Sequence, residues 1–361
     1  MRLLTGPDLV GGLTDALAGG DPVAPVPEPR LLPALAADQP VEEADAVAVV
    51  TTSGSTGEPK AVVLGRAAIR FAADATHARL GGPGEWVCAL PTQHVAGLMT
   101  IARSVVAGTR LRFARTDLAD LPDADGHAYL SLVAAQLDRA LDEPRTRAVL
   151  QGYATVLVGG GAVPVGLRAR AADAGVNVVT TYGMSETCGG CVYDGLPLDG
   201  VRVELDDGRI SLGGPMAFLG YRLRPDLTRD VLSGDLVRTS DRGHWVDGRL
   251  AVRGRIDDVV ISGGSNVDLG AAQRACDAEF GPGVLALLAV PDERWGARIV
   301  GVTTGELALL EVQERLELRV GRAAVPRELR RVARLAYTSI GKIDRTALLR
   351  SWEKGEDGDA G

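Results

Sequence analysis

Between residues 46 and 181, short runs of apolar and β-branched residues alternate with longer stretches that have helical periodicity. The apolar runs predict strands over 46–51, 86–90, 110–113, 128–132, 154–158 and 176–181. The stretches between them predict helices over 66–80, 95–107, 133–141 and 164–174. This alternation is typical of βαβ units, so the sequence predicts an α/β fold with a largely parallel sheet. Ligands of such sheets bind at the carboxyl ends of the strands.

The pattern changes after about residue 200. The segments VRVELDDGRISLGG and GHWVDGRLAVRGR each place an Asp-Gly pair between alternating runs, which predicts two hairpins. A smaller α+β unit follows, with helices expected over 268–279, 306–320 and 344–352 and strands within 284–303. We therefore expect a large N-terminal domain over 1–255, a small C-terminal domain over 258–352 and a disordered tail over 353–361.

Composition excludes several classes of protein. The chain has 361 residues, 46% of them hydrophobic and 24% charged, which is typical of a globular protein. A net charge of −8 with no cluster of Lys and Arg argues against a nucleic-acid partner. Pro7, Asp8 and Asp15 interrupt the N-terminal apolar stretch, and runs such as 284–290 are too short to span a bilayer. We expect a cytoplasmic protein without an integral membrane segment.

The loop TTSGSTGEPK, residues 51–60, differs from the usual phosphate-binding loop of ATPases. In the usual motif a lysine directly follows the second glycine and a hydroxyl residue follows the lysine. Here two residues separate Gly57 from Lys60, and Ala61 stands in the hydroxyl position. Side-chain hydroxyls and flexible backbone amides nevertheless suit a polyphosphate that is held and then released. Ser53, Ser55 and Thr56 supply such hydroxyls.

Further polar segments follow the predicted strands or lie in later loops. They are PTQHVAGL (91–98), VGGGAVP (158–164), TYGMSET (181–187), TSD (239–241), RGRIDDVVISGGSNVD (253–268) and SIGKIDR (339–345). The TSD segment is expected to precede a hairpin. Lysine is scarce, with only Lys60, Lys342 and Lys354 among 39 basic residues, and the first two lie in glycine-containing loops. A lysine in an arginine-rich chain can mark a site that requires a compact ammonium group.

In this order, from about residue 46 to 350, the segments resemble the acyl-adenylate-forming superfamily, which includes acyl-CoA synthetases, peptide-synthetase adenylation domains and luciferases. The resemblance implies a large domain with βαβ sheets and a barrel-like part, joined by a hinge to a small mobile domain. It also implies an ATP-dependent acid–CoA ligase, which forms an acyl-AMP with release of pyrophosphate and then transfers the acyl group to coenzyme A. ATP, Mg²⁺ and coenzyme A are the expected cofactors and co-substrates.

The resemblance assigns roles to individual residues. It gives catalytic roles to Lys342, Thr187 and Glu186, with Glu186 as the Mg²⁺ ligand and Thr187 at the α-phosphate. Asp257 would lie at the hinge. Residues on the coenzyme A side would be Gly263 and Gly264. Residues that would bind ATP are Ser53, Gly54, Ser55, Thr56, Gly57 and Lys60 at the phosphates, Gly159, Gly160, Gly161 and Tyr182 at the adenine, and Asp241 with Arg255 at the ribose.

Two segments, YGMSETCGGCVYDG and YLSLVAAQLDRAL, are similar to one subgroup, the short actinobacterial 2-succinylbenzoate–CoA ligases of menaquinone biosynthesis. Fewer residues precede the phosphate loop than in typical superfamily members, so we expect a shortened front to the large domain. An exposed patch there would be compatible with a homodimer, although the sequence does not determine the oligomeric state. The substrate is a dicarboxylate whose distal carboxylate needs polar partners. Candidates are Gln93, His94, Ser185, Gly189 and Gly190.

Other functions remain open at this point. A coenzyme A ligase for another aryl or medium-chain acid is the nearest alternative, and a nucleotide-binding protein without catalysis is a second. Cys188 and Cys191 form a C-x-x-C pair that could indicate redox or metal chemistry. Cys88 and Cys276 do not supply a second such pair, and the motif does not open a thioredoxin-like βαβ unit, which argues against both roles.

Overall fold

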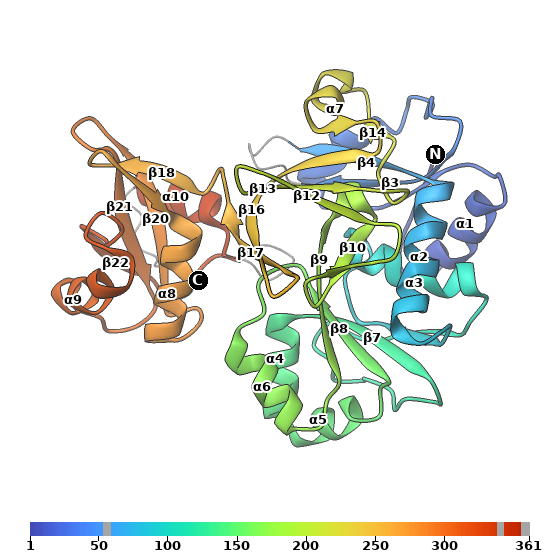
Figure 1. Ribbon diagram of the computed structural model, residues 1–361, viewed down its shortest axis with the longest axis horizontal. Coiled ribbons are helices and arrows are strands. Elements are labelled where there is room, and N and C mark those ends of the chain that lie inside the picture. The colour runs from blue at the N-terminus through green and yellow to red at the C-terminus, as the bar shows by residue number, and fades with distance from the viewer. Residues whose placement is uncertain (53–58, 338–342, 355–361) are drawn as a thin grey trace. The chain divides into compact units, whose positions relative to one another are not determined.

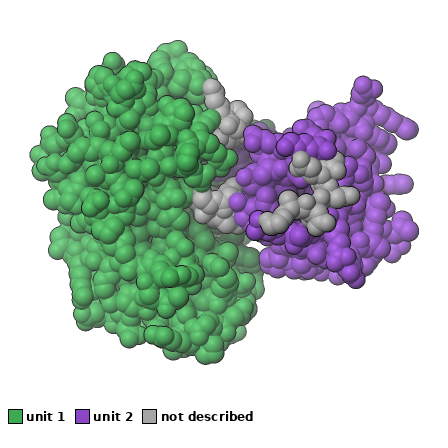
Figure 2. All heavy atoms as spheres, turned by 180° about the vertical axis from the view of Figure 1, so that it is seen from behind, with its two compact units in different colours: residues 1–239, 245–251 green, residues 240–244, 252–361 purple. Residues whose placement is uncertain are grey.

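The computed structural model describes residues 1–52, 59–337 and 343–354 (Figure 1). The chain folds into two compact units (Figure 2). Unit 1 contains residues 1–239 and 245–251, and unit 2 contains residues 240–244 and 252–361. The fold is mixed α/β, as the sequence predicts.

Unit 1 contains a seven-stranded sheet. Its strand order is β11-β10-β9-β8-β7-β5-β6, and β9, β8, β7, β5 and β6 are parallel, as expected from the βαβ pattern. The two added strands are antiparallel and were not predicted. The strands are β5 (Glu85–Cys88), β6 (Leu111–Phe113), β7 (Ala128–Val133), β8 (Thr155–Gly159), β9 (Val178–Met184), β10 (Gly189–Tyr193) and β11 (Leu196–Pro197).

Both faces of this sheet are buried, which explains why its strands are nearly continuous apolar runs. On β8, Val156 and Val158 face one hydrophobic cluster while Leu157 faces another. Helices α4 (Ala134–Asp142), α5 (Pro144–Leu150) and α6 (Val165–Asp173) contribute to the first cluster. Helices α1 (Asp8–Leu17), α2 (Arg66–Leu80) and α3 (Val95–Ala107) contribute to the second, and α2 and α3 lie side by side (Figure 1).

Two further five-stranded sheets include residues of unit 1. The first has the order β1-β2-β3-β4-β14, formed by β1 (Arg2–Leu4), β2 (Val23–Pro25), β3 (Ala46–Thr52), β4 (Lys60–Gly65) and β14 (Gly220–Tyr221). The second has the order β12-β13-β16-β15, with β17 paired to β16. It is formed by β12 (Arg202–Asp206), β13 (Arg209–Gly213), β15 (Leu232–Ser233), β16 (Leu236–Val246) and β17 (Arg249–Arg255). Short helices are η1 (Pro29–Leu35), η2 (Ser185–Thr187) and α7 (Pro225–Val231).

The two predicted Asp-Gly hairpins are present. Asp207 and Gly208 have φ of 47° and 76°, and Asp247 and Gly248 have φ of 48° and 73°. Two positive φ values in succession are those of a type I′ turn, whose twist matches that of the paired strands. The position expected for the TSD segment was wrong, because residues 239–241 lie inside β16 rather than before a hairpin.

The sequence analysis predicts no element within residues 1–44, but the structure has helix α1 there. Helix α1 buries Leu9, Leu13, Ala16 and Leu17, a spacing of four, three and one residues that places them on one helical face.

Unit 2 contains a sheet in the order β19-β18-β21-β20, with β22 paired to β21. Its elements are β18 (Val259–Ser262), β19 (Ser265–Asp268), α8 (Leu269–Phe280), β20 (Leu285–Asp292), β21 (Gly296–Thr303), α9 (Leu309–Val320), β22 (Leu329–Arg331) and α10 (Arg345–Lys354). Gln273 of α8 fixes the helix on the sheet, because its amide donates to the Leu285 carbonyl and accepts from the Leu287 N–H. The tail expected over 353–361 lies outside the described residues except for Glu353 and Lys354, which end α10. Throughout the described ranges, no helix is long and apolar enough to cross a membrane.

Candidate active site

Several predicted site residues lie at or just beyond the carboxyl ends of parallel strands. Gly159 is the last residue of β8, and Ser185, Glu186 and Thr187 form η2 directly after β9. His94 follows β5 and occupies the N-cap position of α3, as expected of a histidine between a strand and a helix. Parallel strands present their carboxyl ends at one edge of the sheet, where ligands of α/β folds bind.

Glu186 is the buried carboxylate of this edge, with 6% of its surface exposed. The phenol of Tyr221, on β14, donates a hydrogen bond of 2.5 Å to Glu186 Oε1. The backbone is fixed as well, since the Phe218 N–H donates to the Glu186 carbonyl at 2.9 Å. Burial, followed by the negative charge of Glu186, raises the pKa of Tyr221 far above its usual range, so Tyr221 stays protonated and remains the donor.

Lys60 lies close to the Tyr221 ring. It is the first residue of β4, and its Nζ is 5.2 Å from the centroid of the ring. Strands β4 and β14 are antiparallel neighbours, and this pairing explains the approach. The structure therefore brings an ammonium group and a buried carboxylate to the same aromatic side chain, directly beside the end of the predicted phosphate loop. A hard anionic oxygen of this kind suits Mg²⁺, which is commonly held by one or two carboxylates together with substrate phosphates.

The side chain of Thr187 is completely buried and is engaged by the backbone. Its hydroxyl accepts from the Met184 N–H at 3.0 Å and lies 3.1 and 2.9 Å from the carbonyl oxygens of Met184 and Gly189. It therefore stabilises the turn that carries Glu186. Contact between Thr187 and an α-phosphate stays a prediction.

Two predicted site glycines, Gly159 at the end of β8 and Gly190 in β10, are required by the packing of the strands as well. A Cβ on Gly159 would lie 2.4 Å from Thr181 Oγ1, and a Cβ on Gly190 would lie 2.8 Å from Thr181 Cβ. Both strands thus approach Thr181 too closely for a side chain. Gly160 and Gly161, by contrast, are exposed.

Tyr182 is placed differently from the expectation. It was predicted in a loop after its strand, but β9 continues to Met184, and Tyr182 pairs with Val192 of β10. The antiparallel β10, which the sequence analysis missed, extends the strand through this segment.

The predicted substrate residues are half-buried or buried. Gln93 and His94 are half-buried, and burial lowers the pKa of His94. A histidine with a lowered pKa is neutral near pH 7. Ser185 and Gly190 are half-buried, and Gly189 is buried beside α3, where a Cβ would lie 3.9 Å from the Met99 side chain.

Arg103 is a residue that the sequence analysis missed. It lies on α3 one turn after Met99, is 5% exposed, and places its guanidinium 5.0 Å from the centre of the Trp86 ring. Its Nε is buried without a hydrogen-bond partner, and no carboxylate pairs with it among the residues that the structure describes. Its charge also acts on the buried thiol of Cys188. The sequence feature that could have identified Arg103 is its charge within the otherwise apolar helix VAGLMTIARSVVA, nine positions after His94.

Cys188 and Cys191 are both buried, at 0% and 1% exposure. Burial raises the pKa of each thiol to about 12, so neither forms the thiolate that redox or metal chemistry requires. Across the described ranges, no group of three or more His, Cys, Asp or Glu side chains is placed to hold a metal ion by itself.

Asp241, Arg255 and Asp257 are close together in unit 2. The Arg255 guanidinium donates two hydrogen bonds of 2.7 Å to the Asp257 carboxylate and lies 3.9 Å from Asp241. Gly263 and Gly264 form the turn between β18 and β19 with φ of 58° and 79°. Lys342 lies outside the described residues, as do Ser53, Gly54, Ser55, Thr56 and Gly57.

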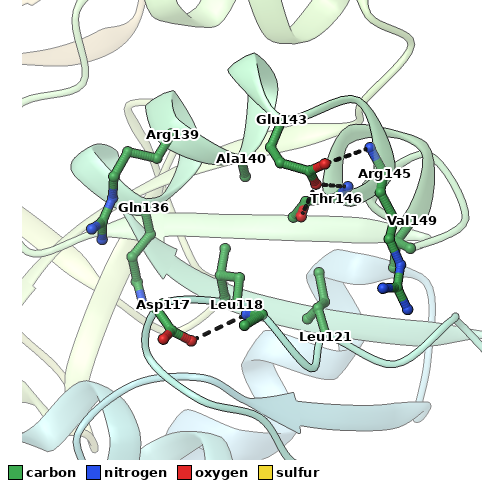
Figure 3. A pocket seen from close by; sticks show the side chains of 11 residues that line it. Asp117, Leu118, Leu121, Gln136, Arg139, Ala140, Glu143, Arg145, Thr146 and Val149 are labelled. Carbon is green, nitrogen blue, oxygen red and sulfur yellow. Dashed lines mark hydrogen bonds between the residues drawn. The ribbon is translucent and has the colours of Figure 1, made fainter.

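A well-bounded cavity of unit 1 lies elsewhere. It has a volume of about 360 Å³ and opens between α4, α5 and residues 117–121 (Figure 3). None of the predicted site residues lines it. Its Glu143 carboxylate is already engaged as the N-cap of α5, where it accepts from the N–H groups of Arg145 and Thr146. The predicted site residues therefore lie outside this cavity.

Residues 12–256 match the family of AMP-binding enzymes, so the chain belongs to that family. Within it, the chain is 40% identical to a probable 2-succinylbenzoate–CoA ligase of Mycobacterium tuberculosis, over 95% of this chain and 94% of the relative. The 2-succinylbenzoate–CoA ligase of Enterococcus faecalis is 26% identical over 84% of this chain and 69% of its own length.

Solved structures agree on the fold. The chain is similar to o-succinylbenzoate CoA synthetase (MenE) from Bacillus subtilis in complex with the acyl-adenylate OSB-AMP, with a TM-score of 0.74 over 87% of this chain and 70% of that one. An E. coli MenE variant with bound OSB-AMS matches with a TM-score of 0.75 over 99% and 96%. Each is 23% identical to this chain, and at that level the match establishes the fold.

Proposed function

We propose that the protein is a 2-succinylbenzoate–CoA ligase. It joins the carboxylate of the succinyl chain to the α-phosphorus of ATP with loss of pyrophosphate, and then exchanges AMP for the thiol of coenzyme A. Identity of 40% along nearly the whole of two chains of similar length supports this function. The observation within the structure that supports it most directly is the buried Arg103, whose Nε has no hydrogen-bond partner and whose guanidinium forms no ion pair with a carboxylate of the described residues.

The first step brings two anions together, because a carboxylate attacks a triphosphate. The site must therefore neutralise charge that builds up on the α-phosphate and on the leaving pyrophosphate. Lys60 supplies an ammonium group at the end of the phosphate loop, and Glu186 would hold Mg²⁺ beside it. When bound, that ion would supply further positive charge to the phosphate oxygens. Tyr182 with Gly159, Gly160 and Gly161 would face the adenine.

Arg103 would bind the distal carboxylate of the acid. An arginine is charged at any physiological pH, so burying its guanidinium without a carboxylate partner is costly. An anionic ligand that pairs with the guanidinium would offset this cost. Its position one turn beyond Met99, on the helix face that contacts Gly189, supports a place at the inner end of the acid site. Gln93, His94, Ser185 and Gly190 would line the rest of that site.

The second step requires a different environment from the first. We propose that the large domain expected over 1–255 binds ATP and the acid, that Lys342 of the small domain promotes adenylation, and that rotation at Asp257 exchanges Lys342 for the face carrying Gly263 and Gly264. Asp241 and Arg255 would bind the ribose. One site can serve two reactions in this way when a hinged domain presents different residues to it.

Both co-substrates, ATP and coenzyme A, are abundant in the cytoplasm, which supports the expected location. A homodimer remains a prediction, tested by light scattering on the purified protein.

The test is an ATP–pyrophosphate exchange assay with 2-succinylbenzoate and with a panel of aryl and medium-chain acids. Mass spectrometry of the coenzyme A product then identifies the thioester. We expect exchange and thioester with 2-succinylbenzoate at a kcat/KM at least about a hundredfold above plain benzoic or fatty acids. Equal turnover of the other acids would leave only a general acid–CoA ligase. ATP binding without exchange for any acid would favour the non-catalytic alternative.

A further inference from the structure

We propose that Tyr221 is a positioning residue for ATP activation, which fixes the Glu186 carboxylate for Mg²⁺ and holds the Lys60 ammonium for the phosphates. The inference rests on the proposed function for the roles of Glu186 and Lys60. It adds a third side chain, that of Tyr221, which would touch neither ATP nor the acid. Tyr221 would act through Glu186 and Lys60.

The contacts of the phenol determine how the Glu186 carboxylate can be used. The hydroxyl has one proton and donates it to Glu186 Oε1 at 2.5 Å. This bond fixes the carboxylate plane and occupies one of its two oxygens. A hydrogen bond to an ionised oxygen is among the stronger polar contacts in proteins, so the carboxylate orientation is well defined.

The face of the same ring acts on Lys60. The Nζ lies 5.2 Å from the ring centroid, within the range at which an ammonium is attracted to the negative face of an aromatic ring. A flexible lysine stem would otherwise leave this charge in many positions. The two attachments of Tyr221 are chemically separable, because one uses the hydroxyl and the other uses the ring.

Tyr221 can position other groups because it is itself firmly held. Its strand β14 pairs with β4, where Tyr221 is opposite Val62, and its N–H donates to Thr228 Oγ1 at 2.8 Å. Phe218 packs edge-on against its ring at 5.0 Å between centroids. The next residue, Arg222, is 4% exposed and donates to backbone carbonyls at the end of η1, those of Leu35, Ala36, Gln39 and Pro40.

The experiment measures ATP binding in the absence of any acid, by isothermal titration calorimetry with excess Mg²⁺ and with EDTA. The ratio of the two dissociation constants defines the magnesium gain. Tyr221→Phe removes the hydroxyl and keeps the ring, so we expect the gain to fall about tenfold, or about 1.4 kcal/mol, with unchanged affinity in EDTA. Tyr221→Leu also removes the ring, and we expect its ATP affinity in EDTA to fall several-fold as well.

Controls separate positioning from packing. Tyr153→Phe removes another buried phenol of unit 1, which donates to the Pro122 carbonyl at 2.6 Å, and should leave the gain unchanged. Glu186→Gln should abolish the gain, and adding Tyr221→Phe to it should have no further effect, because the two groups act as one unit. Thermal melts confirm that each variant is folded.

The proposal would be overturned if Tyr221→Phe showed the same magnesium gain as the wild type. It would also be overturned if the losses of magnesium gain caused by the two substitutions were fully additive in the double variant. Neither result bears on which acid is activated, since no acid is present. Conversely, a protein that binds ATP with the expected gain but fails to exchange pyrophosphate with 2-succinylbenzoate would refute the proposed substrate and leave the role of Tyr221 standing.

Discussion

Replacement of Arg103 by methionine tests the acid site most sharply. Methionine keeps the length and much of the volume of the arginine stem but removes the guanidinium, whose Nε is buried and unpaired. A carboxylate bound there would gain up to two charge-assisted hydrogen bonds, each worth about 1.5–3 kcal/mol. Taking the lower estimate for both, the loss is about 3 kcal/mol, or about a hundredfold in kcat/KM for 2-succinylbenzoate.

We predict that this substitution lowers activity without lowering the stability of the fold. Removing an unpaired buried charge relieves a desolvation cost, while the lost contact with the Trp86 ring is worth only about 0.5–2 kcal/mol. We therefore expect the Tm of Arg103→Met to equal or exceed that of the wild type. A loss of activity with a maintained Tm would assign the effect to the ligand and not to the fold.

The assay compares two acids in both proteins, 2-succinylbenzoate and 4-oxo-4-phenylbutanoate, which keeps the ketone, chain and ring but lacks the ring carboxylate. Wild type should prefer the dicarboxylate at least about a hundredfold, and Arg103→Met should lose that preference. Arg222→Met serves as a matched control, because that buried guanidinium is satisfied by backbone carbonyls and should affect stability without changing the preference. If Arg103→Met weakens both acids equally, the reasoning is refuted and Arg103 has a structural role.

Three further predictions use the same assays. Lys342→Ala should nearly abolish pyrophosphate exchange while ATP still binds, and exchange within about tenfold of wild type would remove Lys342 from catalysis. Cys188→Ser with Cys191→Ser should stay active within about an order of magnitude and bind no zinc, whereas stoichiometric zinc in the wild type would contradict the argument from the raised thiol pKa values. Burial lowers the pKa of His77 from 6.5 to about 4, so the unfolded state binds the extra proton between these values and stability should decline from pH 6.5 toward 4, by up to about 3 kcal/mol. Denaturant unfolding of wild type and His77→Gln across that range measures the decline, and parallel curves for the two proteins would show that His77 is not its source.

Local sequence was sufficient where a single residue determines the backbone. Helices α2 and α3 end where predicted because Gly81 and Gly108 adopt the left-handed conformation, with φ of 97° and 64°, which stops a helix at little cost. The Asp-Gly hairpins were predicted for the same kind of reason. The parallel order of strands followed from the alternation of apolar runs with helices.

The extent of β9 could not be predicted in this way. Its pairing with β10 depends on Gly159 and Gly190 leaving room for Thr181, and the three residues come from three different strands. A glycine in the sequence does not indicate which strand will pack against it. The segment that contains Tyr182 is therefore predicted as a loop from its sequence, whereas Tyr182 lies near the end of β9.

The sequence by itself determined the family and the α/β architecture and predicted candidate residues for acyl-adenylate chemistry, because all of these depend on residue types and spacings along the chain. Only the tertiary structure decided which other side chains lie next to these candidates. Tyr221 reaches Glu186 across 35 positions of sequence because β14 pairs with β4, and Arg103 turns inward because α3 packs against β10. Such contacts depend on strand register and helix packing, which a local pattern constrains only through the fold as a whole.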